Sequence, residues 1–239
     1  MLFDLEDTLI QTPWADPEQV TIFRQKTRRI LIELGVPSTV LSGIERSTIM
    51  RNKASEYIEQ KCGEKEANRI KREIDNFLAG YERDSARKSE LFPDSIPTLK
   101  NLRNREVKIG LVTNTSARVV ENVFRRFDLA RFFDVVITRE RVRRMKPDPE
   151  GVLLALERLG ARRFFMVGDL MFDVIAAKSA DGVAILVIRP EQTNSQHLYK
   201  GLSAEVERTM RINRKSDLQP DYVVKSLVDV PEIIQSVCI

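Results

Sequence analysis

Apolar residues in the first third of this chain recur at the three-to-four-residue spacing of a helix. The first such stretch ends at Gly35, a residue type that often follows the last turn of a helix. Two more helical stretches follow, from about Ser38 to Cys62 and from about Glu64 to Tyr81. Because nothing between residues 12 and 87 alternates as a strand does, the pattern predicts an all-helical block.

From about residue 92 the pattern changes to helices that alternate with short apolar runs. The helical stretches lie at about 94–104, 117–126, 149–159 and 172–180. The strand candidates between them are Val107–Val112, Val135–Thr138, Phe164–Val167 and Ala184–Ile188. The last two elements are a strand, Tyr222–Val224, and a short helix near Pro231–Val237. This alternation is typical of a parallel sheet in an α/β fold.

The apolar run Met1–Phe3 is a strand candidate that stands alone before the helical block. We predict that it joins the sheet that resumes near residue 92. The fold is then a doubly wound, Rossmann-like α/β core of residues 1–11 and 88–239, with residues 12–87 inserted as an all-helical domain. The alternative, an independent helical domain on a linker, leaves the isolated first strand unexplained.

The composition is that of a globular protein, with 42% hydrophobic and 31% charged residues among 239. No apolar run is long enough to span a bilayer, so no membrane partner is expected. The two cysteines, Cys62 and Cys238, have no metal-like spacing and suit a cytoplasmic location. The net charge is +4, but the basic residues are spread over helical faces without a nucleic-acid motif. We therefore expect no nucleic-acid partner.

Four short polar stretches each begin where an apolar run stops. They are Asp4–Thr8, Thr113–Asn114, Lys146–Pro149, and Asp169 with Asp173. Ligands of open α/β sheets bind outside the carboxyl ends of the strands, where such stretches meet. The four stretches therefore predict one shared site.

The order and residue types of these stretches resemble those of the haloacid dehalogenase superfamily, in its phosphoglycolate-phosphatase-like subgroup with an inserted helical cap. The resemblance covers residues 1–9 and about 92–188, whereas the inserted block matches only in helicity and placement. It implies a phosphoric monoester hydrolase that uses Mg²⁺ and a phospho-aspartate intermediate. It also implies that residues 12–87 are a mobile cap, that the partner is a small phosphorylated metabolite, and that the protein is a monomer or homodimer.

The resemblance also implies a role for each matching residue. Asp4 is the nucleophile, and the Lys146 ammonium is a point charge for that carboxylate and for the phosphoryl group. The hydroxyl of Thr113 and the adjacent backbone amide of Asn114 bind the phosphoryl group. Mg²⁺ is bound by oxygen ligands from Asp4, the main-chain carbonyl of Glu6 and Asp169, and Asp173 supports it.

Glu6 departs from the family pattern, because these phosphatases carry a second aspartate at its position. That position serves as general acid and base, and glutamate places its carboxyl group one methylene farther out. Two interpretations remain open: an active phosphatase that accommodates Glu6, or a weak or inactive protein that binds a phosphorylated ligand or partner. A phosphomutase or a dehalogenase of the same fold would use the same nucleophile, although dehalogenation does not need the acidic cluster.

Two features have no explanation in the resemblance. The polar segment from about residue 191 to 220 is long for a connection between strands, and it contains His197 and a predicted helix at Ser203–Ile212. We expect a surface excursion there, with an oligomer contact as the alternative. The first strand is also short, which suggests either a natural start upstream of Met1 or a trimmed version of the fold.

Overall fold

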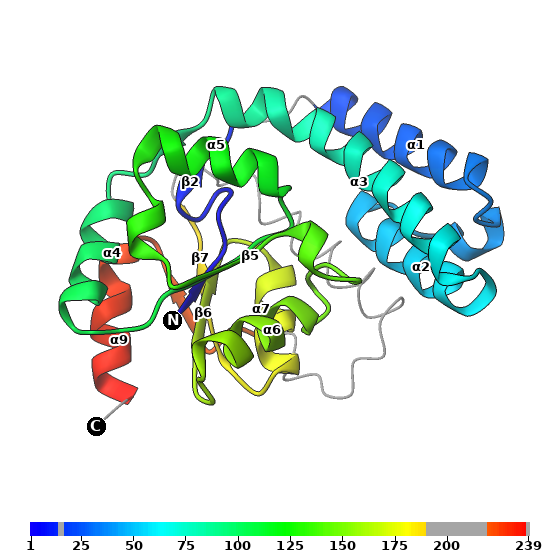
Figure 1. The fold of residues 1–239 in the computed structure, drawn as a ribbon. Coiled ribbons are helices and arrows are strands. Elements are labelled where there is room, and N and C mark those ends of the chain that lie inside the picture. The colour runs from blue at the N-terminus through cyan, green and yellow to red at the C-terminus, as the bar shows by residue number, and fades with distance from the viewer. Residues whose placement is uncertain (14–16, 190–218, 238–239) are drawn as a thin grey trace.

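A six-stranded parallel sheet forms the centre of the molecule, in the order β5-β4-β1-β6-β7-β8 (Figure 1). The computed structural model describes residues 1–13, 17–189 and 219–237. Its strands are β1 (Leu2–Phe3), β4 (Gly110–Val112), β5 (Val135–Ile137), β6 (Phe165–Gly168), β7 (Val183–Val187) and β8 (Tyr222–Val224). The short β1 lies between β4 and β6, which confirms that the isolated first strand belongs to the sheet.

Helices cover both faces of this sheet, as a doubly wound fold requires. One face carries α6 (Glu150–Leu159) and α7 (Met171–Ser179), and the other carries α4 (Ser95–Asn104), α5 (Ala117–Phe127) and α9 (Val230–Val237). Successive strand residues point to opposite faces of the sheet. Leu2 therefore packs in the apolar core on the side of α6 and α7, and Phe3 in the core on the side of α4, α5 and α9. The predicted α/β fold class is confirmed.

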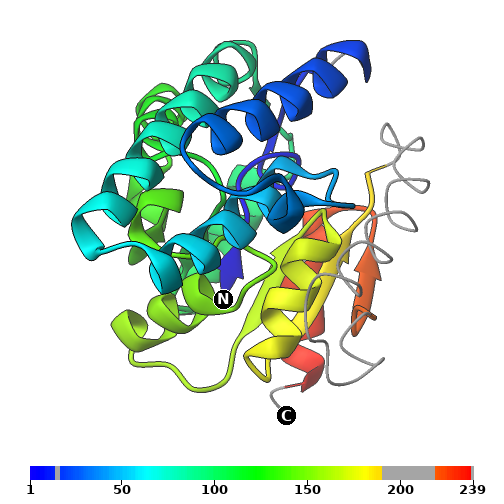
Figure 2. The same ribbon diagram turned by 90° about the vertical axis from the view of Figure 1, so that its right-hand side faces the viewer.

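The inserted segment forms a helical block of α1 (Pro17–Glu33), the short 3-10 helix η1 (Ser38–Leu41), α2 (Ser47–Lys61) and α3 (Glu64–Arg87). Figures 1 and 2 show α1, α2 and most of α3 packed together beside the core, while the end of α3 returns to it. Aromatic stacking joins the first and third helices, because Phe23 stacks on Phe77 and on Tyr81. The division into two domains stays a prediction.

A small antiparallel pair joins the two crossings between the core and the helical block. Strand β2 (Ile10–Gln11) pairs with β3 (Glu90–Leu91), in a sheet separate from the large one. Each strand has only two residues, which is too short to show the alternation that predicts strands. The chain thus leaves and re-enters the core at one place.

Two predicted helix boundaries are wrong. The stretch from Ser38 to Cys62 is not one helix, because residues 42–46 leave the helical conformation and Gly43 adopts a φ of 69° there. Glycine reaches this left-handed region without steric cost, so the break is built into the sequence. The third helix continues past Tyr81 to Arg87.

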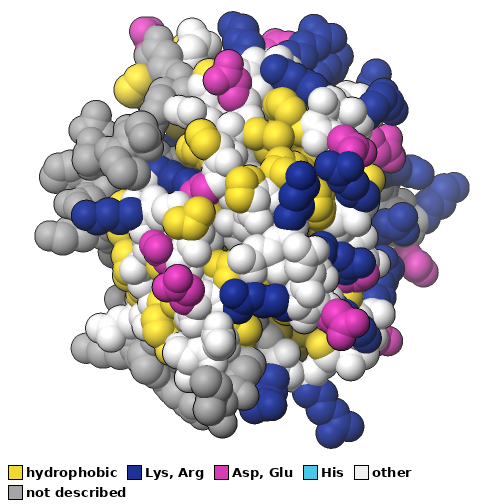
Figure 3. Space-filling view, turned by 90° about the vertical axis from the view of Figure 1, so that its left-hand side faces the viewer, with side chains coloured by type: hydrophobic (Ala, Val, Ile, Leu, Met, Phe, Trp, Pro, Cys, Tyr) yellow, Lys and Arg dark blue, Asp and Glu magenta, His cyan; other side chains and the backbone are white. Residues whose placement is uncertain are grey.

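Some expectations fall outside the described residues, namely the helix at Ser203–Ile212, His197 and Cys238. Among the helices that are described, none is both long and apolar enough to cross a membrane. On the face shown in Figure 3, Lys and Arg side chains are interspersed with acidic and hydrophobic ones. That distribution agrees with the expectation that the basic residues form a solvated surface.

Candidate active site

The predicted site residues meet at the carboxyl ends of the central strands. Asp4 follows β1, Thr113 follows β4 and Asp169 follows β6, while Asp173 lies in the first turn of α7. The carboxylates of Asp4, Asp169 and Asp173 are buried, and one oxygen atom of each lies within 4.8 Å of the others. Two of the four polar stretches therefore supply one acidic cluster.

Lys146 brings a third stretch into this cluster. Its ammonium donates to Asp4 Oδ1 at 2.7 Å, to Asp173 Oδ1 at 2.6 Å and to the Val112 carbonyl at 2.7 Å. Burial acts to lower the pKa of this ammonium, but the carboxylates of Asp173 and Asp4 outweigh it and raise the pKa to about 12. Lys146 is thus a fixed positive charge against Asp4.

The loop after β1 is a compact turn that holds Asp4 in place. The Asp4 amide donates to the Val167 carbonyl at 2.9 Å, which extends the contact between β1 and β6 by one residue. Asp7 adopts a left-handed φ of 54°, and its carboxylate accepts from both the amide and the hydroxyl of Thr12. Aspartate tolerates this conformation better than most residues, so the sequence suits the turn.

The Gly168-Asp169 pair is explained by space as well as by ligand chemistry. A Cβ atom at Gly168 would lie 2.2 Å from Asp173 Cγ, so only glycine leaves room for that carboxylate. Asp173 Oδ2 accepts from the Leu170 amide at 3.0 Å, which also caps the start of α7. Burial raises the pKa of Asp173 to about 6 against the opposing effect of Lys146.

Asp169 lies where the negative charge of the site is concentrated. Burial and the nearby carboxylates of Asp173, Asp7 and Asp4 raise its pKa well above the ordinary value. Thr8 Oγ1 lies 3.3 Å from Asp169 Oδ1 and donates to it. The Lys146 ammonium pairs with two of the three buried carboxylates, Asp4 and Asp173. The donor set consists of hard oxygen atoms in a small space, which fits Mg²⁺.

The loop after β4 lies at the site as predicted, and it also holds the backbone of Lys146. The Thr113 amide donates to the Ile137 carbonyl, and the Thr113 hydroxyl accepts from the Thr115 amide at 3.2 Å. The Asn114 side chain pairs with the backbone of Lys146, accepting from its amide and donating to its carbonyl at 2.9 Å each. Binding of a phosphoryl group by the Thr113 hydroxyl and the Asn114 backbone amide stays a prediction, while the Asn114 side chain holds the backbone of Lys146.

Glu6 lies in a setting that keeps its carboxyl group protonated. Burial, Glu82, Asp4 and Asp7 raise its pKa to about 8, while a hydrogen bond with Thr115 acts in the opposite direction. A carboxyl group that holds its proton at neutral pH is what a general acid requires. The longer side chain therefore still offers the expected chemistry.

These residues line a cavity of about 280 Å³ between the core and the helical block. Phe23, Ser47, Leu78 and Tyr81 line it from the helical block. Its charged lining consists of six carboxylates and two cations: Asp4, Glu6, Asp7, Glu82, Asp169, Asp173, Arg139 and Lys146. An anionic substrate entering this cavity needs further positive charge, which a bound cation supplies.

Two charged residues of the cavity were not predicted from the sequence, Glu82 on α3 and Arg139 after β5. Arg139 is 1% exposed, and its guanidinium pairs with Glu82 and donates to the Asp75 and Asn114 carbonyls at 3.1 Å each. Its place directly beyond Val135–Thr138 was the available signal. No periodic pattern distinguishes Glu82 from the other acidic residues of a long helix.

Comparison with known proteins agrees with this geometry. Residues 1–187 match the haloacid dehalogenase-like hydrolase family. The chain is 32% identical over 173 residues to a phosphoglycolate phosphatase of Shigella boydii serotype 4 (strain Sb227), covering 72% of this chain and 67% of that protein. A phosphoglycolate phosphatase of Salmonella typhimurium is 33% identical over the same shares.

Solved structures share the fold at lower identity. A HAD phosphatase from Thermococcus onnurineus superposes with a TM-score of 0.55 at 24% identity, covering 98% of this chain and 96% of that one. A predicted phosphoglycolate phosphatase from Haemophilus somnus also has a TM-score of 0.55, at 18% identity. With the family match over most of its length, this chain belongs to the haloacid dehalogenase-like hydrolases.

Proposed function

We propose that this chain is a magnesium-dependent phosphatase that hydrolyses a small phosphate monoester through a phospho-aspartate on Asp4. The observation that carries the proposal is the acidic cluster itself. Asp4, Asp169 and Asp173 are buried together, and the Lys146 ammonium pairs with Asp4 and Asp173. Such an arrangement is costly without a cation and suits phosphoryl transfer once a cation is bound.

In the first step, Asp4 is the nucleophile. A carboxylate oxygen of Asp4 forms a bond to phosphorus as the bond from phosphorus to the leaving oxygen breaks. The Glu6 carboxyl group donates its proton to that leaving oxygen, so the product leaves as an alcohol. Lys146 holds Asp4 in place from 2.7 Å and balances charge on the phosphoryl oxygens.

The second step reverses the role of Glu6. Its carboxylate takes a proton from water, and the water oxygen attacks the phosphorus of phospho-Asp4. The bond from Asp4 to phosphorus breaks, which releases inorganic phosphate and restores the Asp4 carboxylate. Glu6 is protonated again, so the cycle closes without any other reagent.

We assign the metal ligands to the carboxylates of Asp4 and Asp169 and the main-chain carbonyl of Glu6, with Asp173 in support. Bound Mg²⁺ would supply positive charge that neutralises the phosphoryl oxygens, so that a carboxylate can attack the phosphorus atom. The raised pKa of Asp169 supports this assignment, because it reflects burial beside the carboxylates of Asp173, Asp7 and Asp4, whose negative charge a bound cation would offset.

The cavity favours a small substrate, and phosphoglycolate is the first candidate. At about 280 Å³ the cavity lies at or below the range usual for drug-sized ligands. Relatives at 32–33% identity are phosphoglycolate phosphatases. We propose that residues 12–87 act as a cap, since helical-block side chains complete the cavity wall. The free thiol of Cys62 suits a cytoplasmic enzyme.

Phosphate release from a panel of phosphate monoesters, with and without Mg²⁺, tests the proposal. We expect turnover of phosphoglycolate or another small monoester that stops when Mg²⁺ is chelated and in Asp4→Asn. The rival, a binding protein disabled by Glu6, predicts no turnover in the wild type and strong turnover in Glu6→Asp. Persistent activity in Asp4→Asn would contradict the nucleophile assignment.

A further inference from the structure

The segment that carries Lys146 into the site contains no helix or strand. It begins after the 3-10 helix η3 (Arg139–Arg141) and ends where α6 starts at Glu150. Its backbone N–H and C=O groups therefore have no regular ladder to satisfy them, and buried ones need other partners. The position of Lys146 depends on what those partners are.

Asn52 of α2 supplies one pair of these contacts. Its Oδ1 accepts from the Met145 amide at 2.8 Å, and its Nδ2 donates to the Met145 carbonyl at 2.7 Å. Asn52 is 8% exposed and lies 93 positions away in the chain. Both polar groups of the residue before Lys146 are thus held by one side chain of the helical block.

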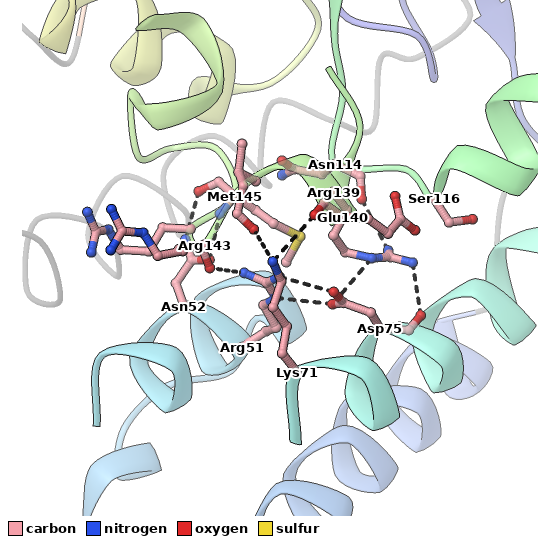
Figure 4. A network of polar contacts seen from close by, with 12 residues as sticks. Arg51, Asn52, Lys71, Asp75, Asn114, Ser116, Arg139, Glu140, Arg143 and Met145 are labelled. Atoms are coloured by element: carbon pink, nitrogen blue, oxygen red, sulfur yellow. Dashed lines mark hydrogen bonds and ion pairs between the residues drawn. The ribbon is translucent and has the colours of Figure 1, made fainter. Parts of the chain in front are cut away.

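Two cations of the helical block hold the residues just before Met145. Arg51 donates to the Arg143 carbonyl, and Lys71 Nζ donates to the Val142 carbonyl at 2.7 Å. Arg51 is fully buried, and its guanidinium is fixed by the Asp75 carboxylate at 3.1 and 3.2 Å. Figure 4 shows these side chains pointing from α2 and α3 toward the segment.

Contacts from the core complete the set. Glu150 accepts from the amides of Arg143 and Arg144, and Asn114 pairs with the amide and carbonyl of Lys146. The division is clear: the carbonyls at positions 142, 143 and 145 accept from the helical block. The block therefore holds carbonyl groups of the segment before Lys146, while the core holds the amides of Arg143 and Arg144 and the backbone of Lys146 itself.

We propose that Asn52, supported by Arg51 and Lys71, is a positioning residue for Lys146. The helical block then has a second task beyond covering the cavity, because its seating on the core sets the approach of the ammonium to Asp4 and Asp173. The inference rests on the proposed role of Lys146 in phosphoryl transfer. A displacement of about 1 Å at such a group is enough to lower a rate about a hundredfold.

The test is a double-mutant cycle on the full chain with Mg²⁺ and the best monoester of the panel. We expect Asn52→Ala to lower kcat about tenfold or more with little change in KM, because ground-state binding does not use Asn52. In a Lys146→Met background the same change should have no further effect on kcat, since Asn52 acts through Lys146. Asn76→Ala, which removes an exposed amide from α3, is the matched control and should leave kcat unchanged.

The outcomes separate this inference from the proposed function. If the wild type shows no turnover, or if Lys146→Met leaves kcat unchanged, the proposed function is refuted rather than the positioning role of Asn52. If the wild type does turn over substrate and Lys146→Met lowers kcat, two results overturn the positioning role of Asn52. One is a normal kcat in Asn52→Ala, and the other is an equal loss of kcat from Asn52→Ala in the wild-type and Lys146→Met backgrounds. If Asn52→Ala does not fold, Lys71→Met keeps the aliphatic stem and removes the donor to the Val142 and Glu140 carbonyls, so the same cycle applies with a smaller expected loss.

Discussion

At the scale of single residues, the chemistry depends on how burial and neighbouring charges set the pKa values of Lys146 and Glu6. Lys146 keeps its proton because Asp173 and Asp4 outweigh its burial. Glu6 keeps its proton because burial and three carboxylates act in the same direction. One group is therefore a permanent cation and the other a proton donor, although both face the same cavity.

The pH dependence of kcat/KM should report Glu6. Its pKa is raised to about 8, so the acid form is present at neutral pH and is lost as pH rises through that value. Bound Mg²⁺ lowers this pKa by adding positive charge, which places the alkaline limb at or below pH 8. Glu6→Gln should remove the limb and lower kcat about a hundredfold or more. An unchanged limb in Glu6→Gln assigns it to another group.

Gly168→Ala should disable the site without touching a reactive atom. The added methyl group would lie 2.2 Å from Asp173 Cγ, so the carboxylate must move and release Lys146. We expect at least about a hundredfold loss of kcat with a folded protein, measured by phosphate release and circular dichroism. Gly80→Ala, where nothing lies within 4 Å of an added Cβ, is the control.

The sequence predicts site residues that directly follow strands better than site residues that lie on the helices of the inserted block. Asp4, Thr113 and Asp169 each follow an apolar run, and the parallel sheet then brings them together. Glu82 and Asn52 lie on helices whose pattern only separates buried from exposed faces. Their contacts are set by how the helical block packs on the core, which no local spacing encodes.

At the scale of elements, the strands and core helices follow the predicted ranges within a few residues. Helix ends in the inserted block do not, because the break near Gly43 lies inside an otherwise helical apolar pattern. The pair β2–β3 escaped prediction because two-residue strands carry no period. The position of β2 and β3 is decided by pairing between distant segments, Ile10 with Leu91 for example.

Asp94, which directly precedes α4, ties three elements together through one carboxylate. Its Oδ2 accepts from Arg189 Nη1 and Ser226 Oγ at 2.6 Å and from the Leu227 amide at 2.8 Å. Arg189 also stacks on the Phe92 ring and donates to the Thr8 carbonyl. The end of β7, the segment after β8 and the turn after Asp4 are therefore linked at this point.

Asp94→Asn should lower the free energy of unfolding by about 3 kcal/mol at neutral pH, because it leaves the buried Arg189 without its partner. Burial acts to raise the pKa of Asp94, but Arg189 and the other donors outweigh it and lower the pKa below 3.8. The contribution is thus complete above about pH 4 and is lost as pH falls through the folded-state pKa. The difference in the free energy of unfolding between variant and wild type, measured by urea denaturation, should become smaller at low pH.

The exposed Asp84 provides the matched control for that measurement. Asp84→Asn removes the same charge from α3 and should change stability by less than about 0.5 kcal/mol. An equal loss in both variants would mean that net charge, rather than the link through Asp94, sets the effect.

At the scale of the whole molecule, the fold places an acidic cavity where the helical block meets the core. The cavity is lined from both sides, so substrate binding and block position are linked. The chain carries a net charge of +4, whereas the cavity concentrates carboxylates. That contrast is the physical reason to expect a resident cation at the site.

Mg²⁺ should therefore stabilise the folded chain. Binding to the native state alone raises the melting temperature, by about 2–4 °C for each kcal/mol of binding free energy in a chain of this size. The rise should be lost in Asp169→Asn, measured by thermal unfolding with Mg²⁺ and with chelator. An equal rise in the variant would place the ion elsewhere.

The most direct test of the central claim is capture of the covalent intermediate. Glu6→Gln should be mixed with Mg²⁺ and p-nitrophenyl phosphate, whose good leaving group needs no proton donor, and then quenched in acid. Without Glu6 as base, the second step slows and the phospho-enzyme accumulates. Mass spectrometry should find one phosphoryl group on the peptide that contains Asp4, and none when Asp4→Asn is added. A phosphoryl group on another residue, or release of p-nitrophenol without any labelled protein, would contradict the account.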